Sequence, residues 1–344
     1  SISEINAFND DFLNNLEDLE ILSSEDIFSP EEVVILPDMW EKTTKEDLIF
    51  LLESVNKINS PILKNELLST LNINSLAPIS FNQIDFQKLI IKSLLNLGER
   101  KKAYNIIQSI PIDLESKNNA YYNEIKLNYL LSNNNTLKDA CAFLNLIKDS
   151  VSINNNFFLK VDIFCLVAQE KLQQANLLNS ILNETSDFTD EYFQYLFQKL
   201  KDNNLELDNN KFDINQDNIF LYSAMHQIGN IPMTEEFLNI DSINLSMSIT
   251  LNNSTDIKLR LKAAHLAYFN NFLKADSIAA LYQAADFSFE KLNNPLTVIP
   301  SLKNNIEMEM AYLYQLIGIQ LLPITRLEAL LEFWKYAEKN NLEL

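Results

Sequence analysis

Residues 97–107 read LGERKKAYNII, and this stretch decides the fold of the chain. Gly98 separates two runs of apolar residues at helical spacing, so we expect one helix over 86–97 and a second over 99–110. Pro111 follows and predicts the end of the second helix. The stretch therefore predicts two helices joined by a tight turn, a helical hairpin.

The second helix of this hairpin has a pattern that returns along the chain. A small residue is followed four positions later by a position where an aromatic or apolar residue is expected, which Asn179 does not supply. The three small residues lie 37 and 35 positions apart. The pairs are Ala103 with Ile107, Ala140 with Leu144, and Ala175 with Asn179. The pattern resembles the second half of a tetratricopeptide repeat, whose period is about 34 residues. This resemblance implies an α-solenoid, in which each hairpin buries its apolar face against the next.

A second resemblance rests on short motifs in a fixed order. They are Leu36-Pro37-Asp38-Met39-Trp40, Ser60-Pro61-Ile62-Leu63, Leu97-Gly98, Ala140-Cys141-Ala142 and Phe164-Cys165. Their succession looks like an uncharacterised bacterial helical family, some of whose members carry an antifreeze-related label. It covers residues 33–290 and implies a helical architecture, with no activity attached.

The whole chain is expected to be all-α and to consist of five parts. Thr44 with Asp47 predicts one helix start, and Ser60 with Pro61 predicts another. The parts are an acidic N-terminal helix and linker at 1–44, a first helical hairpin at 45–80, tetratricopeptide-like hairpins at 81–202, an irregular helical insert at 203–250, and C-terminal hairpins with an aromatic cap at 251–344.

Composition narrows the classes of function. With only 3 glycines the chain has no phosphate-binding or nucleophile-elbow loop, and Asn is expected to take left-handed turns in place of Gly. The net charge is −20, and residues 1–50 contain 14 acidic residues and 2 lysines. We therefore expect no nucleic-acid partner, and a basic or amphipathic protein or peptide instead. The longest apolar stretch, 310–324, includes Gln, Gly and Pro, so no transmembrane helix is expected.

Two groups of aromatic residues are candidates for a partner surface. In the N-terminal segment one apolar face is formed by Ile5, Phe8, Phe12, Leu16 and Leu19. This face either packs on the body of the protein or belongs to a detachable acidic arm that meets a basic partner. Near the C-terminus the aromatics are Tyr312, Tyr314, Phe333, Trp334 and Tyr336, which form either the core of a terminal cap or an exposed groove. The partner-surface interpretation selects Phe8, Phe12, Tyr312 and Trp334.

The cysteines and histidines offer little chemistry. Cys141 is predicted on the second helix of one hairpin and Cys165 on the first helix of the next. They either form a disulfide, which implies an oxidising compartment such as a periplasm, or remain buried thiols of a cytoplasmic protein. His226 and His265 have no metal-ligand spacing and are expected to be hydrogen-bonded near the core. We expect no catalytic residue, metal or cofactor.

These observations favour a non-enzymatic scaffold or adaptor that binds a protein or peptide. Two alternatives stay open. One is a subunit of a bacterial envelope assembly, and the other is a small-ligand-binding or enzymatic protein with a pocket between helices. The oligomeric state is left open by the sequence.

Overall fold

The computed structural model describes residues 40–55, 58, 60–71, 76–79, 81–110, 118–132, 136–148, 156–186, 189–202, 212–302 and 305–339. Every regular element in these ranges is a helix, which confirms the all-α prediction. The chain forms two compact units. Within the described ranges, the first unit runs from Trp40 to Ile231 and includes Ile243–Ser248, and the second contains Pro232–Ser242 and the chain from Ile249 onward.

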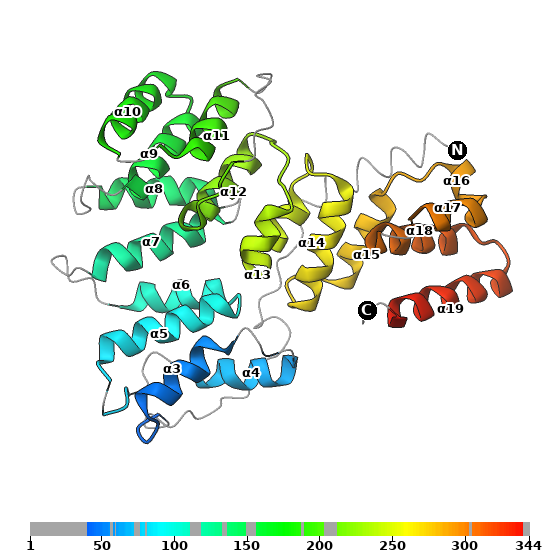
Figure 1. Cartoon of the computed structure of the whole chain (residues 1–344), viewed down its shortest axis with the longest axis horizontal. Helices are drawn as coiled ribbons and strands as arrows, with labels where there is room; N and C mark the ends of the chain where they lie inside the picture. The colour runs from blue at the N-terminus through cyan, green and yellow to red at the C-terminus, as the bar shows by residue number, and fades with distance from the viewer. Residues whose placement is uncertain are drawn as a thin grey trace. The chain divides into compact units, whose positions relative to one another are not determined.

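Consecutive helices pack against one another through much of the first unit (Figure 1). Its elements are α3 (Lys45–Glu53), α4 (Pro61–Thr70), α5 (Gln83–Asn96), α6 (Arg100–Ser109), α7 (Asn118–Leu131), α8 (Leu137–Ile147), α9 (Asn156–Ala168), α10 (Leu172–Thr185), α11 (Glu191–Lys201), the 3-10 helix η4 (Gln216–Asn218) and α12 (Ile219–Ile228). From α5 to α10 each helix contacts its successor, while α12 also packs on α7 and α9. Both predicted helix starts in this unit are confirmed, since the Thr44 and Ser60 side chains cap α3 and α4.

The tight turns between helices use the left-handed backbone region. Gly98, with φ 84°, follows α5, and the Glu99 N–H donates to the Leu94 carbonyl in a Schellman motif. The same pattern of hydrogen bonds occurs at Glu170, Asn230 and Asn271, all with positive φ. Two of these residues are asparagines, as expected for a chain with few glycines. Glu170 is the exception, because its long side chain lacks the short polar group that lets asparagine tolerate this conformation.

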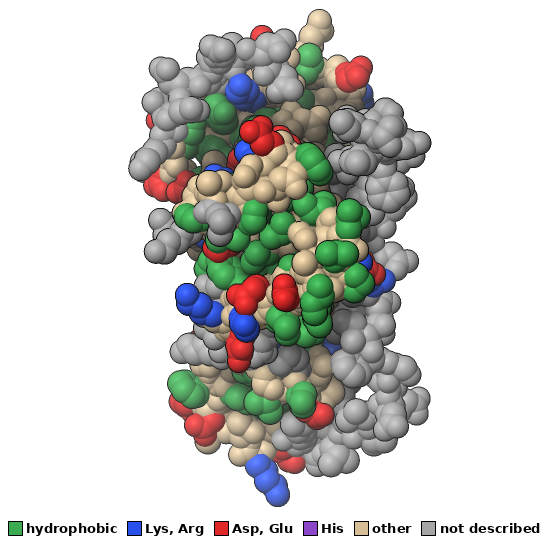
Figure 2. Space-filling model, turned by 90° about the vertical axis from the view of Figure 1, so that its right-hand side faces the viewer, with side chains coloured by type: hydrophobic (Ala, Val, Ile, Leu, Met, Phe, Trp, Pro, Cys, Tyr) green, Lys and Arg blue, Asp and Glu red, His purple; other side chains and the backbone are tan. Residues whose placement is uncertain are grey.

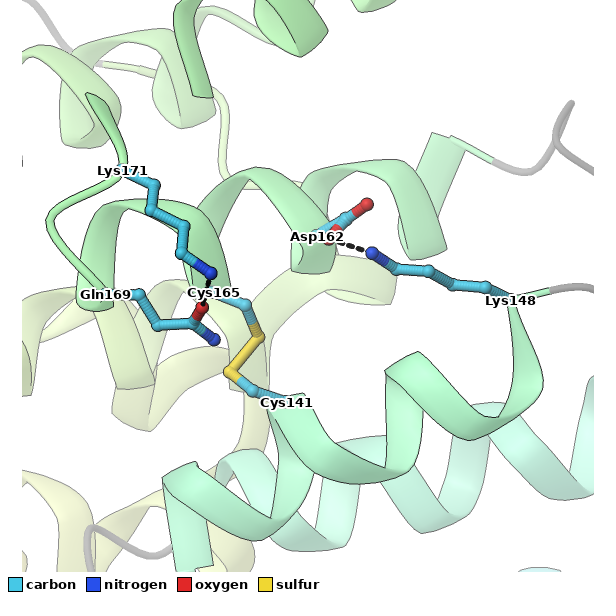
Figure 3. Close-up of a disulfide and its surroundings, with 6 residues drawn as sticks. All are labelled: Cys141, Lys148, Asp162, Cys165, Gln169 and Lys171. Carbon is cyan, nitrogen blue, oxygen red and sulfur yellow. Dashed lines mark hydrogen bonds and ion pairs between the residues drawn. A yellow bond between two sulfur atoms is a disulfide. The ribbon is translucent and has the colours of Figure 1, made fainter. Parts of the chain in front are cut away.

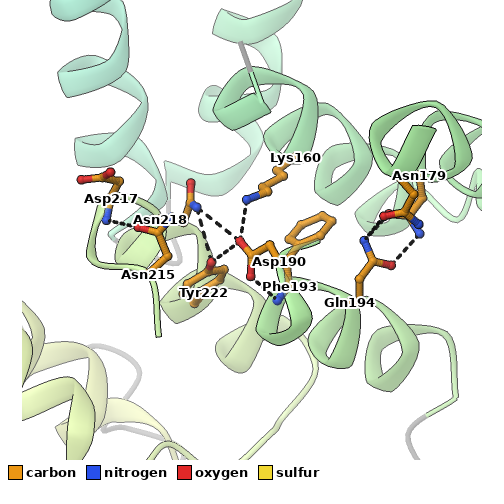
Figure 4. Close-up of polar contacts among 10 residues, drawn as sticks. Lys160, Asn179, Asp190, Phe193, Gln194, Asn215, Asp217, Asn218 and Tyr222 are labelled. Carbon is orange, nitrogen blue, oxygen red and sulfur yellow. Dashed lines mark hydrogen bonds and ion pairs between the residues drawn. The ribbon is translucent and has the colours of Figure 1, made fainter. Parts of the chain in front are cut away.

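The three recurring alanines are completely buried, as a close contact between helices requires. The position four residues after each is also buried, including Asn179 in α10, where an apolar residue was expected. Asn179 tolerates burial because its side-chain amide exchanges two hydrogen bonds with that of Gln194 in α11, at 2.8 and 2.9 Å (Figure 4). A paired amide therefore replaces an apolar contact between these two helices.

The second unit is arranged around one central helix. Its helices include α14 (Ile257–Phe269), α15 (Ala275–Ala284), α16 (Phe289–Leu292), α17 (Pro295–Leu302), α18 (Ile306–Ile319) and α19 (Pro323–Lys339). Helix α18 contacts α14, α15, α16, α17 and α19, so packing here is not limited to neighbours in the chain. The helix α13 (Glu236–Leu251) is divided between the two units and is broken at Asp241. It lies in the region 203–250 that was predicted to be irregular, of which residues 203–211 are not described.

Candidate functional site

Asp190 lies where four helical elements of the first unit meet. It is the N-cap of α11, and its Oδ1 accepts the Phe193 backbone N–H at 3.0 Å. Its Oδ2 accepts hydrogen bonds from Lys160 Nζ of α9 and from the Tyr222 hydroxyl of α12, each at 2.5 Å (Figure 4). The Asn218 side-chain amide of η4 donates a longer bond of 3.4 Å to the same oxygen. One carboxylate thus connects α9, η4, α11 and α12.

Lys160 is the single basic residue of a helix that is otherwise largely apolar. Its side chain is 8% exposed and that of Asp190 is 13% exposed. A charge buried to this extent needs an opposite charge and hydrogen bonds, because removal from water is unfavourable. The Lys160–Asp190 ion pair meets this need, so the two charges cancel within the network.

The protonation states of this network follow from its contacts. Burial raises the pKa of Asp190, but hydrogen bonds from Lys160, Tyr222 and the Phe193 N–H, together with the Lys160 charge, outweigh burial and hold this pKa below its usual range. For the Tyr222 hydroxyl, burial and the neighbouring Asp190 carboxylate both raise the pKa. At neutral pH Asp190 is therefore ionised and Tyr222 is protonated, so the phenol is not poised to act as a base.

A cavity of about 640 Å³ lies beside the network. Its lining carboxylates are Glu124, Asp190, Glu191, Asp213 and Asp217. The lining also includes Lys160, three asparagines, Thr189 and Phe157. Because Lys160 is paired with Asp190, the other four carboxylates have no basic partner among the lining residues. The cavity therefore has an excess of negative charge that favours a cationic group.

One carboxylate of this cavity, Glu124, has a raised pKa. Burial raises the pKa of Glu124 in α7, and the negative charge of Asp217 raises it further. A bound cation would favour the ionised form of Glu124, so cation binding and deprotonation of this residue are linked. In the ranges that the structure describes, no three His, Cys, Asp or Glu side chains are placed to hold a metal ion.

Cys141 of α8 and Cys165 of α9 are joined by a disulfide (Figure 3). Their Cα atoms lie 5.6 Å apart, within the usual range for such a bond. The structure contains the disulfide rather than two free thiols, which were the two alternatives that the sequence left open. An ion pair between Lys148 and Asp162, at 2.8 Å, connects α9 with the C-cap residue that follows α8.

The two histidines are buried and hydrogen-bonded, in agreement with their prediction. His226 Nε2 contacts the Tyr192 hydroxyl at 2.6 Å and its Nδ1 contacts the Ile231 carbonyl at 3.1 Å. His265 Nε2 contacts the Tyr282 hydroxyl at 2.6 Å, and burial lowers the pKa of His265 to about 4. Neither histidine lines the acidic cavity.

The aromatic residues proposed for a partner surface have different environments. Tyr312 is completely buried in α18, where its hydroxyl donates to the Lys291 carbonyl at 2.8 Å, so its assignment to a partner surface is wrong. The central position of α18 explains the error, because neighbouring helices surround this residue. Trp334 of α19 is 59% exposed and remains a candidate. Phe8 and Phe12 lie outside the described residues.

Sequence reasoning missed the Lys160–Asp190–Tyr222 network. Its members are 30 and 32 residues apart along the chain, so no local motif contains them. Two weak signals exist. Lys160 is a lone basic residue in an apolar helix, and Asp190 precedes an amphipathic run as an N-cap does. Each signal indicates a residue that needs a partner, but neither identifies that partner.

Comparison with known proteins adds no relative, since no protein-family model, curated protein or solved structure matches this chain. Both resemblances drawn from the sequence therefore stay predictions. Across the described ranges, no helix is sufficiently long and apolar to span a membrane.

Proposed function

We propose that this protein is a non-enzymatic scaffold, an α-solenoid of tetratricopeptide-like hairpins, whose acidic cavity binds a lysine- or arginine-containing segment of a partner protein. The observation that carries the proposal is the cavity itself, with five carboxylates and one lysine that is already paired. A cationic side chain entering it meets unneutralised negative charge in a partly enclosed space, where Coulomb attraction is stronger than in open water.

The helix packing supports a scaffold. Consecutive contacts from α5 to α10 and the buried alanines in α6, α8 and α10 are the features that stacked hairpins require. The Asp190 network joins α9, η4, α11 and α12, so it holds one side of the cavity in place. Proteins that bind peptides gain affinity from such preorganisation, because less motion is lost on binding.

A peptide-binding assay tests the cavity directly. The probes are a fluorescently labelled peptide with three spaced lysines and the same peptide with glutamine in their place, both measured by anisotropy. Asp213→Asn with Asp217→Asn should weaken binding of the lysine peptide about three- to tenfold, since an exposed ion pair contributes roughly 0.2–1 kcal/mol. The matched control is Asp276→Asn with Asp286→Asn, two exposed carboxylates of the second unit that change the net charge equally.

The outcomes separate a specific site from general attraction to an acidic protein. A larger loss of lysine-peptide affinity for the cavity pair than for the control pair supports the proposal. The glutamine peptide shows only that binding needs the positive charges. Equal losses for both pairs would contradict it, because the peptide would then respond only to net charge. No binding of the lysine peptide at low salt would also contradict it.

The disulfide favours a second candidate, a subunit of a bacterial envelope assembly. A disulfide of this kind persists in oxidising compartments, of which the bacterial periplasm is one. Alkylation of the protein in its native host, before and after reduction, measures whether Cys141 and Cys165 are bonded there. Free thiols in most molecules would favour a cytoplasmic protein instead.

A further inference from the structure

Helix α19 has two apolar faces, and only one is covered in the described structure. Phe333 and Ala337 are buried, and α19 packs against α18. A second set of apolar side chains is between 42% and 61% exposed, namely Ile324, Leu327, Leu331 and Trp334. Their spacing of three, four and three residues places them on one side of the helix. Hydrophobic side chains gather in the middle of the face shown in Figure 2.

These four residues are called the α19 stripe. Two further exposed leucines, Leu321 and Leu322, precede the helix and extend the apolar surface. Contiguous exposed apolar surface is unfavourable in water and usually marks a place where another segment binds. The 3-4-3 spacing is the spacing by which one helix packs along another, so an amphipathic helix is the segment that the stripe fits.

The chain itself contains such a segment. Residues 1–39 precede the described part, and within them Ile5, Phe8, Phe12, Leu16 and Leu19 share one face of a predicted helix. A helix over 5–19 would be about 22 Å long, which is enough to cover the roughly 15 Å between the first and last residues of the stripe.

Charge and tethering favour this segment over a second copy of the protein. Residues 1–20 contain six acidic and no basic residues, whereas α19 contains three of each and has no net charge that would repel them. Two whole chains each carry a net charge of −20, so they repel one another. The segment is also covalently attached, so its docking does not depend on protein concentration. Residues 20–39 can span up to about 65 Å when extended.

We propose that the α19 stripe is the docking surface for the amphipathic segment 5–19 of the same chain. The interaction buries the exposed indole of Trp334 together with the three aliphatic side chains. It also explains why α19 has apolar residues on two sides, one for α18 and one for the N-terminal segment.

Trp334 makes the proposal measurable in the full chain. The sequence has 2 tryptophans, and Trp40→Phe leaves Trp334 as the single indole emitter. In this background Phe8→Asp with Phe12→Asp should shift the Trp334 emission to longer wavelength and increase acrylamide quenching at least twofold. The matched control is Asn6→Asp with Asn14→Asp, which adds the same charge on the opposite side of the predicted helix and should change neither quantity.

Trp40 is buried, so its replacement is checked by a second measurement that leaves it in place. Hydrogen exchange of α19 amides should be faster with Phe8→Asp and Phe12→Asp than in the unaltered protein. Unchanged Trp334 emission, quenching and α19 exchange in this variant would overturn the proposal. Protection of Trp334 that depends on protein concentration, with a dimer by light scattering, would also overturn it and assign the stripe to a second copy.

Discussion

Replacement of Lys160 by methionine is the most direct test of the Asp190 network. The change keeps the length and apolar stem of the side chain but removes its charge. Asp190 then stays buried without its ion-pair partner. Breaking a buried pair in this way costs about 3–5 kcal/mol. We expect a loss near 3 kcal/mol, because the Tyr222 hydroxyl and the Phe193 N–H still donate to the carboxylate.

A double-mutant cycle isolates the interaction. Asp190→Asn alone leaves Lys160 unpaired, but it retains an oxygen that can cap α11. The double variant has no buried charge, so it should be more stable than the sum of the two single losses predicts, by about 2 kcal/mol. Urea unfolding is followed by circular dichroism and by Trp40 fluorescence in a Trp334→Phe background, because Trp40 belongs to the same unit.

Additive losses within about 0.5 kcal/mol would refute the reasoning. The pH dependence offers a further check. The pKa of Asp190 is lowered from 3.8 in the folded protein, so its contribution to stability is complete above that value and is lost as the pH falls through the folded pKa. The stability difference between the unaltered protein and Asp190→Asn should therefore be constant above pH 5 and shrink below pH 4.

Three further predictions concern the core and the turns. Burial lowers the pKa of His265 from 6.5 to about 4, so the unfolded chain takes up the proton first and stability decreases as the pH is lowered from about 6.5 to 4. His265→Gln should flatten this slope, which is up to about 1.4 kcal/mol per pH unit, in urea titrations between about pH 4 and 7. Glu170→Gly should raise the free energy of unfolding by about 1 kcal/mol, since glycine removes the penalty of a φ of 60°, whereas Glu170→Ala should bring no gain. Ala103→Leu should lower the melting temperature through an overpacking cost of about 1–3 kcal/mol, and Lys101→Leu, at an exposed position of the same helix, should not.

The outcome for the aromatic cap shows the limit of reasoning from helical spacing. Tyr312 and Trp334 both lie in predicted helices with apolar neighbours, and the sequence does not distinguish them. In the structure Tyr312 is surrounded because α18 is central, whereas Trp334 lies on the open side of α19. Burial of an apolar residue thus depends on how many helices surround its own helix, and this number is a property of the packing.

The sequence by itself determined the features that depend on residues a few positions apart. The helical class, the caps at Thr44 and Ser60, the turn at Gly98 and the buried positions of the recurring alanines all follow from spacing and local hydrogen bonding. Only the tertiary structure decided which distant residues meet. The acidic cavity, the Lys160–Asp190 pair and the choice of a disulfide for Cys141 all require separate helices to be placed side by side in one definite register. Local rules set each helix and its apolar face, but the contacts between helices depend on packing of the whole unit.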